Sequence, residues 1–325
     1  MGTSDRAEPV SATVLVRVRC LARPDECPKW IPAGIATASR RWEVPVIEYY
    51  QQPQFQPFSL EHPDNSSNRA GVMLVHGFTG TPADMRPLAE ALHQHDVDCH
   101  VPMHPGMAAD IANMKTMTAE TWRGNILERW AEHTRRYQRS VLIGYSMGGA
   151  AALQMAFQTQ PNLLILIAPF VRINDRRAIF LPLVKHMVKE FRLLGSLDFD
   201  DDGVRQWFRI ALPGVDFDDP ETRRTVRDES GIASPVIDEL RKFGAMGRRD
   251  APTVTAPVVV IQGHQDVVVN PRHTRDLVDS FQNLQAYHEI PGDHLITLDK
   301  VPSWPTVRSL VLGESSSMIR PSSHV

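Results

Sequence analysis

The chain has 325 residues and a formal net charge of −3, and 42% of its residues are hydrophobic and 22% charged. This length accommodates one large α/β domain or two smaller ones, and the composition is that of an ordinary globular chain, which argues against disorder throughout. The negative net charge argues against a nucleic-acid partner, because phosphate binding needs concentrated positive charge.

Low counts of special residues exclude further classes. The three cysteines, Cys20, Cys27 and Cys99, are too few for a disulfide scaffold, and Cys20 and Cys27 could either pair or stay reduced. No residues have the spacing of a metal knuckle, and no apolar run is as long as a membrane span. Asp5 and Glu8 stand where a secretory signal would have basic residues. We therefore expect a cytoplasmic protein with no metal and no stable membrane insertion.

The first 68 residues contain few structural signals. Residues 1–45 hold a possible strand at Thr13–Val18 and are interpreted as an N-terminal extension of uncertain structure. Residues 46–68, which are rich in glutamine, proline and asparagine, are interpreted as a strand and loop that lead into the first regular element. A regular pattern begins only near residue 70.

From residue 70 onward, predicted strands and helices alternate. The continuous apolar run Gly71–Val75 is typical of a strand that is buried on both faces. Further strands are predicted at Val97–Val101, Val141–Ile143, Leu163–Ile167, Val258–Ile261 and Ala286–Ile290. Helical patterns begin after Thr81 and also occur at Thr118–Tyr137, Met147–Gln158, Pro271–Phe281 and Val307–Leu312. Such alternation implies right-handed crossovers, so we predict the α/β class with a mostly parallel central sheet flanked by helices.

Residues 171–252 break the alternation, because they carry a helical pattern without an obvious strand. Leu183, Met187 and Phe191 share one helical face. We interpret the stretch as a helical cap, or lid, inserted between two core strands, and the alternative is that it merely packs on the domain surface. The predicted organisation is an extension at 1–45, a core at 46–170 and 253–313, the cap at 171–252 and a loose tail at 314–325.

A G-x-S-x-G motif, Gly144-Tyr-Ser-Met-Gly148, lies between a predicted strand and a predicted helix. A sharp turn from strand to helix holds the central serine in a strained conformation, and the flanking glycines let the backbone segments approach closely. The turn raises the serine hydroxyl above the sheet edge, beside the positive end of the helix. A chance match is the alternative, and the strand and helix on either side argue against it. We therefore predict Ser146 as a nucleophile.

A serine nucleophile needs a base within hydrogen-bond reach, and the base needs an orienting acid. With this kind of turn the expected chain order is serine, acid, histidine. Asp266 follows the strand Val258–Ile261 through a short loop, and His294 follows the next strand through Pro291-Gly-Asp-His294. Because parallel strands end at the same edge of a sheet, we predict Asp266 as the acid and His294 as the base.

Other residues are weaker candidates for these roles. His100 and His104 precede the serine in the chain, and His288 lies within a predicted strand. Asp293 is adjacent to His294, but neighbours in a loop rarely face each other, so Asp293 is interpreted as structural. The chain has neither H-x-x-E-H nor H-E-x-x-H spacing, which argues against a metallohydrolase.

Attack on an ester places negative charge on the carbonyl oxygen, and preorganised backbone N–H groups stabilise that charge. One donor is expected from Met147, the residue after the serine. The other is expected from Phe78 in the loop His76-Gly-Phe-Thr-Gly80, whose glycines allow a sharp turn. We interpret His76 as a residue that pins this loop and not as the base.

These segments together resemble the bacterial carboxylesterase and monoacylglycerol-lipase group of α/β-hydrolases, over about residues 70–312. The resemblance is carried by Leu74-Val-His-Gly-Phe-Thr-Gly80, Gly144-Tyr-Ser-Met-Gly-Gly149, His264-Gln-Asp266 followed by Asn270-Pro271, and Asp293-His-Leu-Ile-Thr-Leu-Asp299. It implies the α/β-hydrolase fold with a helical cap, and hydrolysis of short- to medium-chain carboxylic esters, including monoglycerides, without a cofactor. His104-Pro-Gly106 departs from the family's G-H-G turn and changes the rim of the site, and residues 1–45 have no counterpart in the family.

The expected reaction has two halves. His294 takes the proton of Ser146 as the oxygen attacks a small-molecule ester, and Asp266 stabilises the imidazolium. The N–H groups of Phe78 and Met147 hold the oxyanion, and water then releases the acid from the acyl-enzyme. No metal or organic cofactor takes part in this scheme.

The leaving group is not encoded in these residues. A thioesterase or amidase could use the same constellation, and a haloperoxidase-like activity is also open, since fold does not fix function. The alternative from another class is a non-catalytic binding protein of the same fold, against which the complete set in the expected order argues. Three apolar residues of the predicted cap, Phe180, Leu183 and Met187, favour a pocket for an acyl chain. The sequence does not indicate an oligomeric state.

Overall fold

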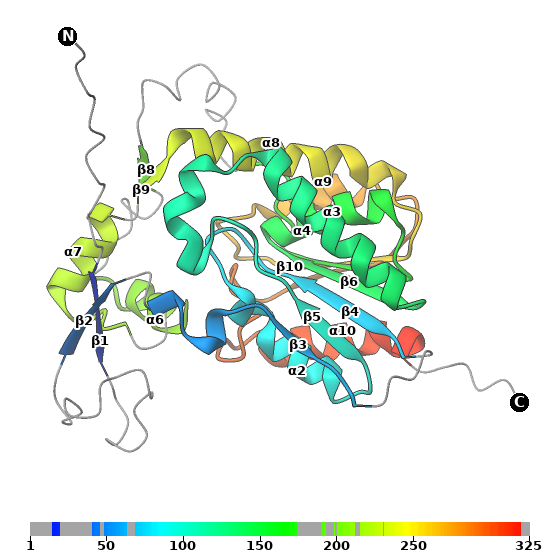
Figure 1. Cartoon of the computed structure of the whole chain (residues 1–325), viewed down its shortest axis with the longest axis horizontal. Coiled ribbons are helices and arrows are strands. Elements are labelled where there is room, and N and C mark those ends of the chain that lie inside the picture. The colour runs from blue at the N-terminus through cyan, green and yellow to red at the C-terminus, as the bar shows by residue number, and fades with distance from the viewer. Residues whose placement is uncertain are drawn as a thin grey trace, which may run out of the picture. The chain divides into compact units, whose positions relative to one another are not determined.

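The computed structural model describes residues 15–19, 41–45, 49–63, 69–173, 190–192, 198, 200–211, 215–229 and 231–319 (Figure 1). The chain divides into two compact units. The smaller unit comprises Met1–Tyr50 and Arg192–Gly231, and the larger comprises Gln51–Phe191 and Ile232–Val325. All five residues predicted to form the site belong to the larger unit.

The larger unit is built on a seven-stranded sheet with the strand order β11-β10-β7-β6-β4-β5-β3. Its strands are β3 (Phe58–Leu60), β4 (Gly71–Val75), β5 (Asp98–Val101), β6 (Ser140–Tyr145), β7 (Leu163–Ile167), β10 (Val258–Gly263) and β11 (Leu284–Ile290). Neighbouring strands are parallel except β3 and β5, where Phe58 lies opposite Val101. Every residue of β4, β6 and β7 is buried, as expected of parallel strands that are covered on both faces.

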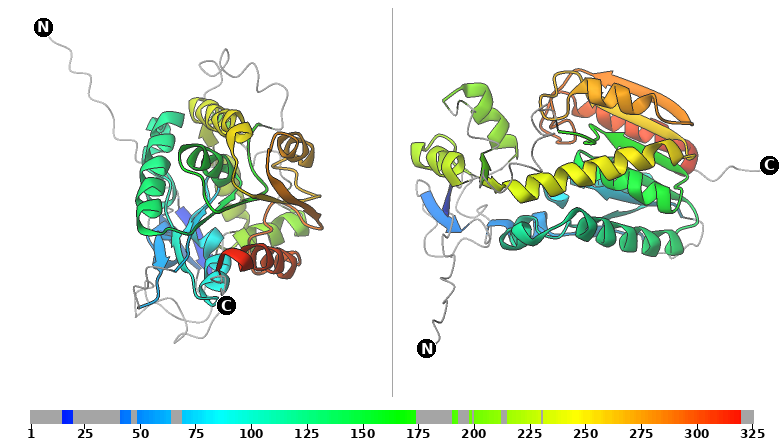
Figure 2. Two further views of the ribbon diagram at one scale, coloured as in Figure 1. Left: turned by 90° about the vertical axis from the view of Figure 1, so that its right-hand side faces the viewer. Right: turned by 90° about the horizontal axis from the view of Figure 1, so that it is seen from above.

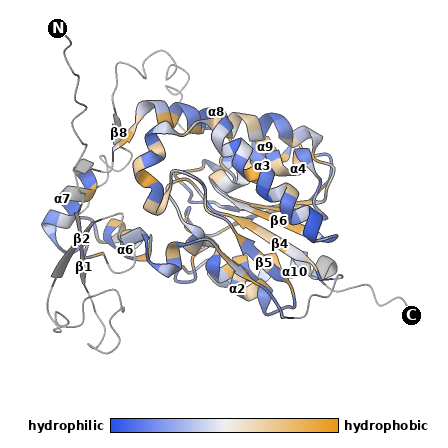
Figure 3. Cartoon of the chain, viewed as in Figure 1, coloured by the Kyte–Doolittle hydropathy of each residue, from blue (hydrophilic) through white to orange (hydrophobic). Residues whose placement is uncertain are grey.

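Helices cover both faces of this sheet (Figure 2). One face carries α3 (Ala119–Arg136), α4 (Met147–Gln158), α8 (Ser234–Asp250) and α9 (Pro271–Val278), and the other carries α2 (Arg86–His93) and α10 (Trp304–Ile319). Side chains alternate along β4, so that Met73 and Val75 pack against the first layer and Val72 and Leu74 against the second. The hydrophobic colour of β4 and β6 in Figure 3 marks this central layer.

These elements confirm the predicted α/β class and the predicted order of strands and helices from residue 70 onward. The helix predicted after Thr81 begins as a 3-10 turn, η2 (Pro82–Met85), where the Thr81 hydroxyl accepts the N–H of Ala83 at 3.2 Å. Further 3-10 turns are η1 (Pro53–Phe55), η3 (Ala108–Thr116) and η5 (Ala251–Thr253).

At the ends of the core, the strand expected within 46–68 is present, whereas the loose tail expected at 314–325 needs correction. The lead-in region at 46–68 contributes an edge strand, β3, to the main sheet. The segment 314–325, predicted as a loose tail, is helical as far as Ile319, because α10 continues through it and buries Ser315. The high serine content that suggested a tail therefore does not prevent this helix from packing.

In the smaller unit, β1 (Leu15–Arg19) and β2 (Arg41–Pro45) pair in antiparallel fashion. β1 agrees with the possible strand predicted at Thr13–Val18. The unit also contains α6 (Asp202–Ala211) and α7 (Pro220–Glu229). Phe208 stacks on Phe217 with 4.8 Å between the ring centroids, which forms a small aromatic core.

The predicted cap at 171–252 does not coincide with one compact unit. Only its middle part belongs to the smaller unit, whereas α8 packs in the larger one. A Cβ atom on Gly247 of α8 would lie 2.7 Å from the Ala150 carbonyl oxygen, so the backbones of α8 and α4 are in close contact. The role of residues 171–252 as a lid stays a prediction.

The same stretch contains two short strands where none was expected. β8 (Glu190–Arg192) and β9 (Gly231–Ala233) form a two-stranded sheet, and segments of three residues are too short to show a periodic pattern. The predicted pocket residues Phe180, Leu183 and Met187 lie outside the described residues. Of the helical face predicted from Leu183, Met187 and Phe191, the structure describes only Phe191, which lies in the strand β8 and not in a helix.

Candidate active site

Ser146 occupies a sharp turn between β6 and α4. Its backbone has φ 54° and ψ −121°, a combination that residues other than glycine rarely adopt. The neighbouring glycines permit this turn. A Cβ on Gly144 would lie 2.3 Å from the Gly148 carbonyl oxygen, and one on Gly148 would lie 2.0 Å from the Val75 carbonyl oxygen. Any larger residue at either position would therefore push the strand and the helix apart.

The His294 imidazole, in the loop after β11, bridges Ser146 and Asp266. Its Nε2 lies 3.0 Å from the serine Oγ, and its Nδ1 lies 2.7 Å from Oδ2 of Asp266. All three side chains are buried. When Nδ1 donates to the carboxylate, Nε2 carries the lone pair that faces the serine hydroxyl. The structure thus brings the three predicted residues into hydrogen-bond contact, and their catalytic role stays a prediction.

Asp266 is held by its own loop. Its Oδ1 accepts the N–H groups of Val268 at 2.9 Å and Val269 at 2.8 Å. At the end of β10, a Cβ on Gly263 would lie 2.2 Å from the Asp293 carbonyl oxygen, so this strand touches the loop that carries His294. Two residues 28 positions apart therefore meet because adjacent parallel strands end side by side.

Tyr145 also contacts the histidine, and the sequence did not reveal this contact. Its hydroxyl donates to the His294 carbonyl oxygen at 2.8 Å, and its ring centroid lies 5.2 Å from that of the imidazole. Burial raises the pKa of this hydroxyl well above its usual range, so it stays a donor at neutral pH. The residue before the serine has no specified type in G-x-S-x-G, so the motif contained no signal for this contact.

The loop from His76 to Gly80 passes directly beside the serine. A Cβ on Gly77 would lie 2.9 Å from Cβ and 3.3 Å from Oγ of Ser146. The loop is closed by the Gly80 N–H, which donates to the Gly77 carbonyl at 3.3 Å, and Phe78 lies within this turn. Met147 is the first residue of α4, where N–H groups have no partner inside the helix. These placements support the predicted oxyanion hole, which remains a prediction.

His76 pins the same loop. Its Nδ1 donates to the Gly77 carbonyl at 2.9 Å, and its Nε2 accepts the N–H of His104 at 3.3 Å. Burial lowers the pKa of His76 to about 4, and burial likewise lowers the pKa of His104 well below its usual range. Both rings are therefore neutral at physiological pH and hold backbone groups, which supports the interpretation of His76 as structural.

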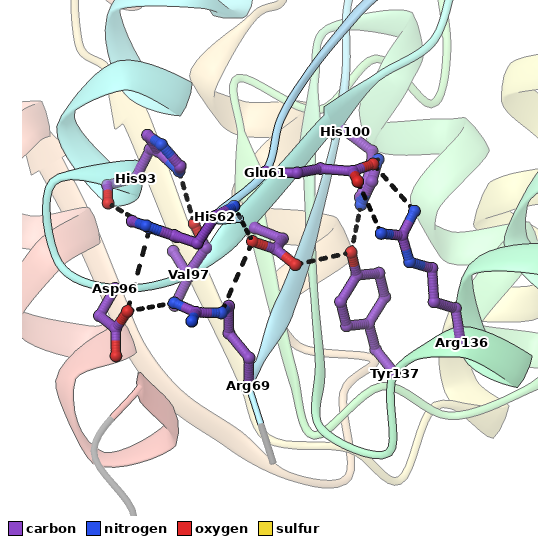
Figure 4. Close-up of polar contacts among 10 residues, drawn as sticks. Glu61, His62, Arg69, His93, Asp96, Val97, His100, Arg136 and Tyr137 are labelled. Carbon is purple, nitrogen blue, oxygen red and sulfur yellow. Dashed lines mark hydrogen bonds and ion pairs between the residues drawn. The ribbon is translucent and has the colours of Figure 1, made fainter. Parts of the chain in front are cut away.

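The other candidates have partners away from the serine. Oδ1 of Asp293 accepts the N–H of Leu295 at 2.8 Å, as in a turn. His288 lies 3.2 Å from a carboxylate oxygen of Glu314. His100 belongs to a polar cluster near the amino-terminal ends of β4 and β5, the edge of the sheet opposite Ser146 (Figure 4).

The described residues also bear on metal and membrane binding. Within those ranges, no group of three or more His, Cys, Asp or Glu side chains is arranged to hold a metal ion. The helices in the described part of the chain are all too short or too polar to cross a bilayer. Cys99 is a buried free thiol, whereas Cys20 and Cys27 lie outside the described residues.

Comparison with known sequences finds a matching family and several similar proteins. The model of the family described as serine aminopeptidase, S33, matches residues 66–299. A thermostable monoacylglycerol lipase of Bacillus sp. (strain H-257) is 27% identical over 216 residues, which is 66% of this chain and 76% of that protein. A carboxylesterase of Bacillus subtilis (strain 168) is 20% identical over 250 residues, which is 75% of this chain and 90% of that protein.

Comparison with solved structures confirms the α/β-hydrolase fold. A structure reported with the metagenome-derived lipolytic enzymes LipS and LipT superposes with a TM-score of 0.63 at 24% identity, over 82% of this chain and 98% of its own. A monoacylglycerol lipase of Paleococcus ferrophilus superposes with a TM-score of 0.60 at 16% identity, over 81% of this chain and 98% of its own.

Proposed function

The chain belongs to the serine aminopeptidase S33 family of α/β-hydrolases, and from that premise we propose that it cleaves carboxylic esters through an acyl-enzyme intermediate formed on Ser146. The observation that carries the proposal is the unbroken line of hydrogen bonds from Asp266 through His294 to Ser146, with distances of 2.7 and 3.0 Å. A strained, buried serine that faces an imidazole in this way is an activated nucleophile.

In the first half-reaction, the Oγ of Ser146 attacks the carbonyl carbon of the ester while Nε2 of His294 accepts its proton. The carbonyl oxygen becomes negative, and the N–H groups of Phe78 and Met147 donate hydrogen bonds to it. Asp266 stabilises the imidazolium that forms. The bond to the alcohol oxygen then breaks, and His294 returns the proton to the leaving alcohol.

In the second half-reaction, water occupies the place of the alcohol. His294 accepts a proton from water as its oxygen attacks the acyl-enzyme, and the same N–H groups hold the second oxyanion. Collapse releases the carboxylic acid and returns the proton to Ser146. Every proton in the cycle moves through His294, so the proposal requires no cofactor.

For the substrate class, we propose short- to medium-chain acyl esters or monoglycerides. The names of the two relatives, a monoacylglycerol lipase and a carboxylesterase, support this choice. A thioesterase or amidase would use the same residues with a different leaving group. A non-catalytic binding protein would have no need of a strained serine within 3.0 Å of an imidazole nitrogen.

The test is a series of p-nitrophenyl esters of increasing acyl length, assayed with the wild type and with Ser146→Ala. We expect turnover by the wild type only, with a maximum at a short or medium chain. Parallel assays with acyl-CoA and p-nitroanilides separate the ester from the thioester and amide alternatives. Turnover that survives in Ser146→Ala, or a wild type that no fluorophosphonate probe labels, would remove the proposal.

A further inference from the structure

Gln262 is a fully buried glutamine at the end of β10, and it lies behind the proposed catalytic acid. A buried amide needs acceptors for its N–H groups and a donor for its oxygen, because an unpaired polar group in the interior is destabilising. In this structure, one of the hydrogen-bond partners of the Gln262 amide is the carboxylate of Asp266.

The Nε2 of Gln262 donates to Oδ2 of Asp266 and to the Gly263 carbonyl, each at 3.1 Å. Oδ2 is the same oxygen that accepts Nδ1 of His294 at 2.7 Å. The other carboxylate oxygen, Oδ1, is already occupied by the N–H groups of Val268 and Val269. The carboxylate therefore receives donors on both oxygens, and it cannot rotate about its Cβ–Cγ bond without breaking hydrogen bonds.

Thr274 supplies the donor that the oxygen of this amide needs. Its hydroxyl, from the buried face of α9, donates to Oε1 of Gln262 at 2.6 Å. If the amide were turned end for end, Oε1 would face the Asp266 carboxylate, and two acceptors would meet in a buried site. The carboxylate therefore specifies the orientation of the amide, and the Thr274 hydroxyl satisfies the oxygen that this orientation turns toward α9.

We infer that Gln262 and Thr274 are positioning residues that hold the Asp266 carboxylate in the orientation His294 requires. This inference rests on the proposed function, because the line of hydrogen bonds from Asp266 to Ser146 is what they would position. The line of contacts then runs from Thr274 through Gln262 and Asp266 to His294. Because Thr274 belongs to α9 and His294 contacts Ser146, the packing of α9 affects how the nucleophile is held.

The two residues act only through Asp266, so their loss should affect the chemical step more than substrate binding. With Gln262→Leu, the carboxylate loses one of the two donors on Oδ2, and the imidazole is held less firmly. We expect kcat to fall about 10- to 100-fold, as small misplacements of catalytic groups do, while KM changes less than about twofold. Thr274→Val, which removes only the hydroxyl, should lower kcat less, by about three- to tenfold.

The decisive experiment is a double-mutant cycle on ester turnover. Thr274 acts through Gln262, so the double variant Gln262→Leu/Thr274→Val should be no slower than Gln262→Leu alone. Thr274→Ser keeps the hydroxyl and should restore kcat to within about twofold of the wild type. A purely structural role for Thr274 would instead give additive losses.

Gln154→Leu is the matched control. Gln154 is also fully buried, and its Nε2 donates to the carbonyls of Ala150 and Phe243 at 3.2 and 3.3 Å. Its loss should lower the melting temperature while kcat stays unchanged. If Gln262→Leu does not fold, the difference in kcat between Thr274→Val and Thr274→Ser is sufficient to test the inference.

The outcomes separate the inference from the function on which it rests. If the wild type turns over esters and Ser146→Ala does not, but Gln262→Leu and Thr274→Val keep wild-type kcat, the positioning role is wrong and the proposed function stands. Additive losses in the double variant, or equal kcat in Thr274→Ser and Thr274→Val, would also overturn it. If the wild type itself fails to turn over esters, the proposed function has failed first.

Discussion

The carboxyl edge of the central sheet, where its parallel strands end, and the opposite edge, where they begin, carry the same kinds of residue in different arrangements. At the carboxyl edge, an aspartate, a histidine and Ser146 form one line of hydrogen bonds. Near the opposite edge, Ser59 Oγ lies 2.8 Å from Nδ1 of His100. Nε2 of the same ring lies 2.8 Å from the Tyr137 hydroxyl (Figure 4). That hydroxyl in turn donates to Asp98 at 3.0 Å. A serine, a histidine and an aspartate are therefore linked at both edges.

The backbone distinguishes the two edges. Ser59 lies on the extended strand β3, where His100 of β5 is its cross-strand partner. Ser146 lies in a strained turn at the start of α4, beside the loop of Gly77. At the opposite edge, the Tyr137 phenol stands between His100 and the Asp98 carboxylate. The Glu61 carboxylate lies 3.8 Å from Nδ1 of His100, on the nitrogen that faces Ser59 and not on the one opposite to it. Residue type alone therefore does not distinguish the two edges, because the carboxyl edge also has a strained serine at the start of a helix and a direct hydrogen bond between carboxylate and imidazole.

The largest expected effect separates the two serines. Ser146→Ala should lower kcat for ester hydrolysis about 10⁴-fold or more, because no other group can form the acyl-enzyme. Ser59→Ala, at the other edge, should leave kcat within about twofold of the wild type. Steady-state assays on one nitrophenyl ester measure both. A large loss in Ser59→Ala would show that the two edges do not differ in this way.

The two aspartates should differ almost as much. Asp266→Asn should lower kcat about 10³- to 10⁴-fold with little change in folding, because an amide lacks the negative charge that stabilises the imidazolium of His294. Asp98→Asn should instead lower the free energy of unfolding and spare kcat. Asp98 accepts the Tyr137 hydroxyl and the N–H of His62 and makes no contact with the serine. Urea unfolding combined with turnover assays distinguishes the two outcomes.

Gly77, in the loop beside Ser146, and Gly124, in α3, form a further pair in which substitution is expected to affect kcat at one position and not at the other. In Gly77→Ala, the new methyl group would lie 2.9 Å from the Cβ of Ser146, so the loop must move. Displacing one oxyanion donor should lower kcat about 10²- to 10³-fold. At Gly124 in α3 a Cβ would meet nothing within 4 Å, and Gly124→Ala should stabilise the helix by about 0.5–1 kcal/mol without affecting kcat. An unchanged kcat in Gly77→Ala would contradict the assignment of Phe78.

The carboxyl edge could be predicted because each of its parts comes after a strong strand signal. Ser146 and Asp266 each stand shortly after a strand with an apolar run, and His294 follows the next strand along the chain. Parallel strands bring the loops at their carboxyl ends to one edge. The contacts of Tyr145 and Gln262 could not be predicted in the same way. They depend on side-chain directions at the ends of β6 and β10, which no local pattern of residue types specifies.

The contacts at the opposite edge were harder to predict from the sequence. The contact between Ser59 and His100 depends on the register between β3 and β5, which are about 40 residues apart. β3 has only three residues and ends in a polar segment, so its pattern does not stand out from a loop. The same shortness concealed β8 and β9. Strands of this length are specified by tertiary contacts rather than by their own residues.

A pH-dependent effect on stability should come from the buried histidines near the amino-terminal edge. His133 is buried against Trp130, with 5.3 Å between the stacked rings, and its Nε2 has no hydrogen-bond partner among the described residues. Burial, followed by the nearby His100, lowers the pKa of His133 from 6.5 to about 3. As the pH falls below 6.5, the unfolded chain binds a proton that the folded chain does not, so stability is complete above 6.5 and is lost toward 3.

His133→Phe should make this loss shallower by up to about 1.4 kcal/mol per pH unit between pH 6.5 and 4. The phenyl ring keeps the stacking on Trp130 and removes the titrating group. Urea unfolding at several pH values, for the wild type and the variant, gives the two slopes. Equal slopes would mean that His133 does not titrate differently in the folded and unfolded chains.

The smallest expected effect concerns the two tyrosines, whose hydroxyls both donate to buried acceptors. Tyr145→Phe removes only the hydrogen bond to the His294 carbonyl and should lower kcat about three- to tenfold, because the histidine loop is held less firmly while the ring contact remains. Tyr137→Phe should lower the free energy of unfolding by about 1 kcal/mol and leave kcat unchanged. Since each variant deletes one hydroxyl from a ring that keeps its packing, a difference in kcat between them isolates the contribution of position. Equal kcat values would instead mean that the loop itself and Asp266 hold His294 in place without the Tyr145 hydroxyl.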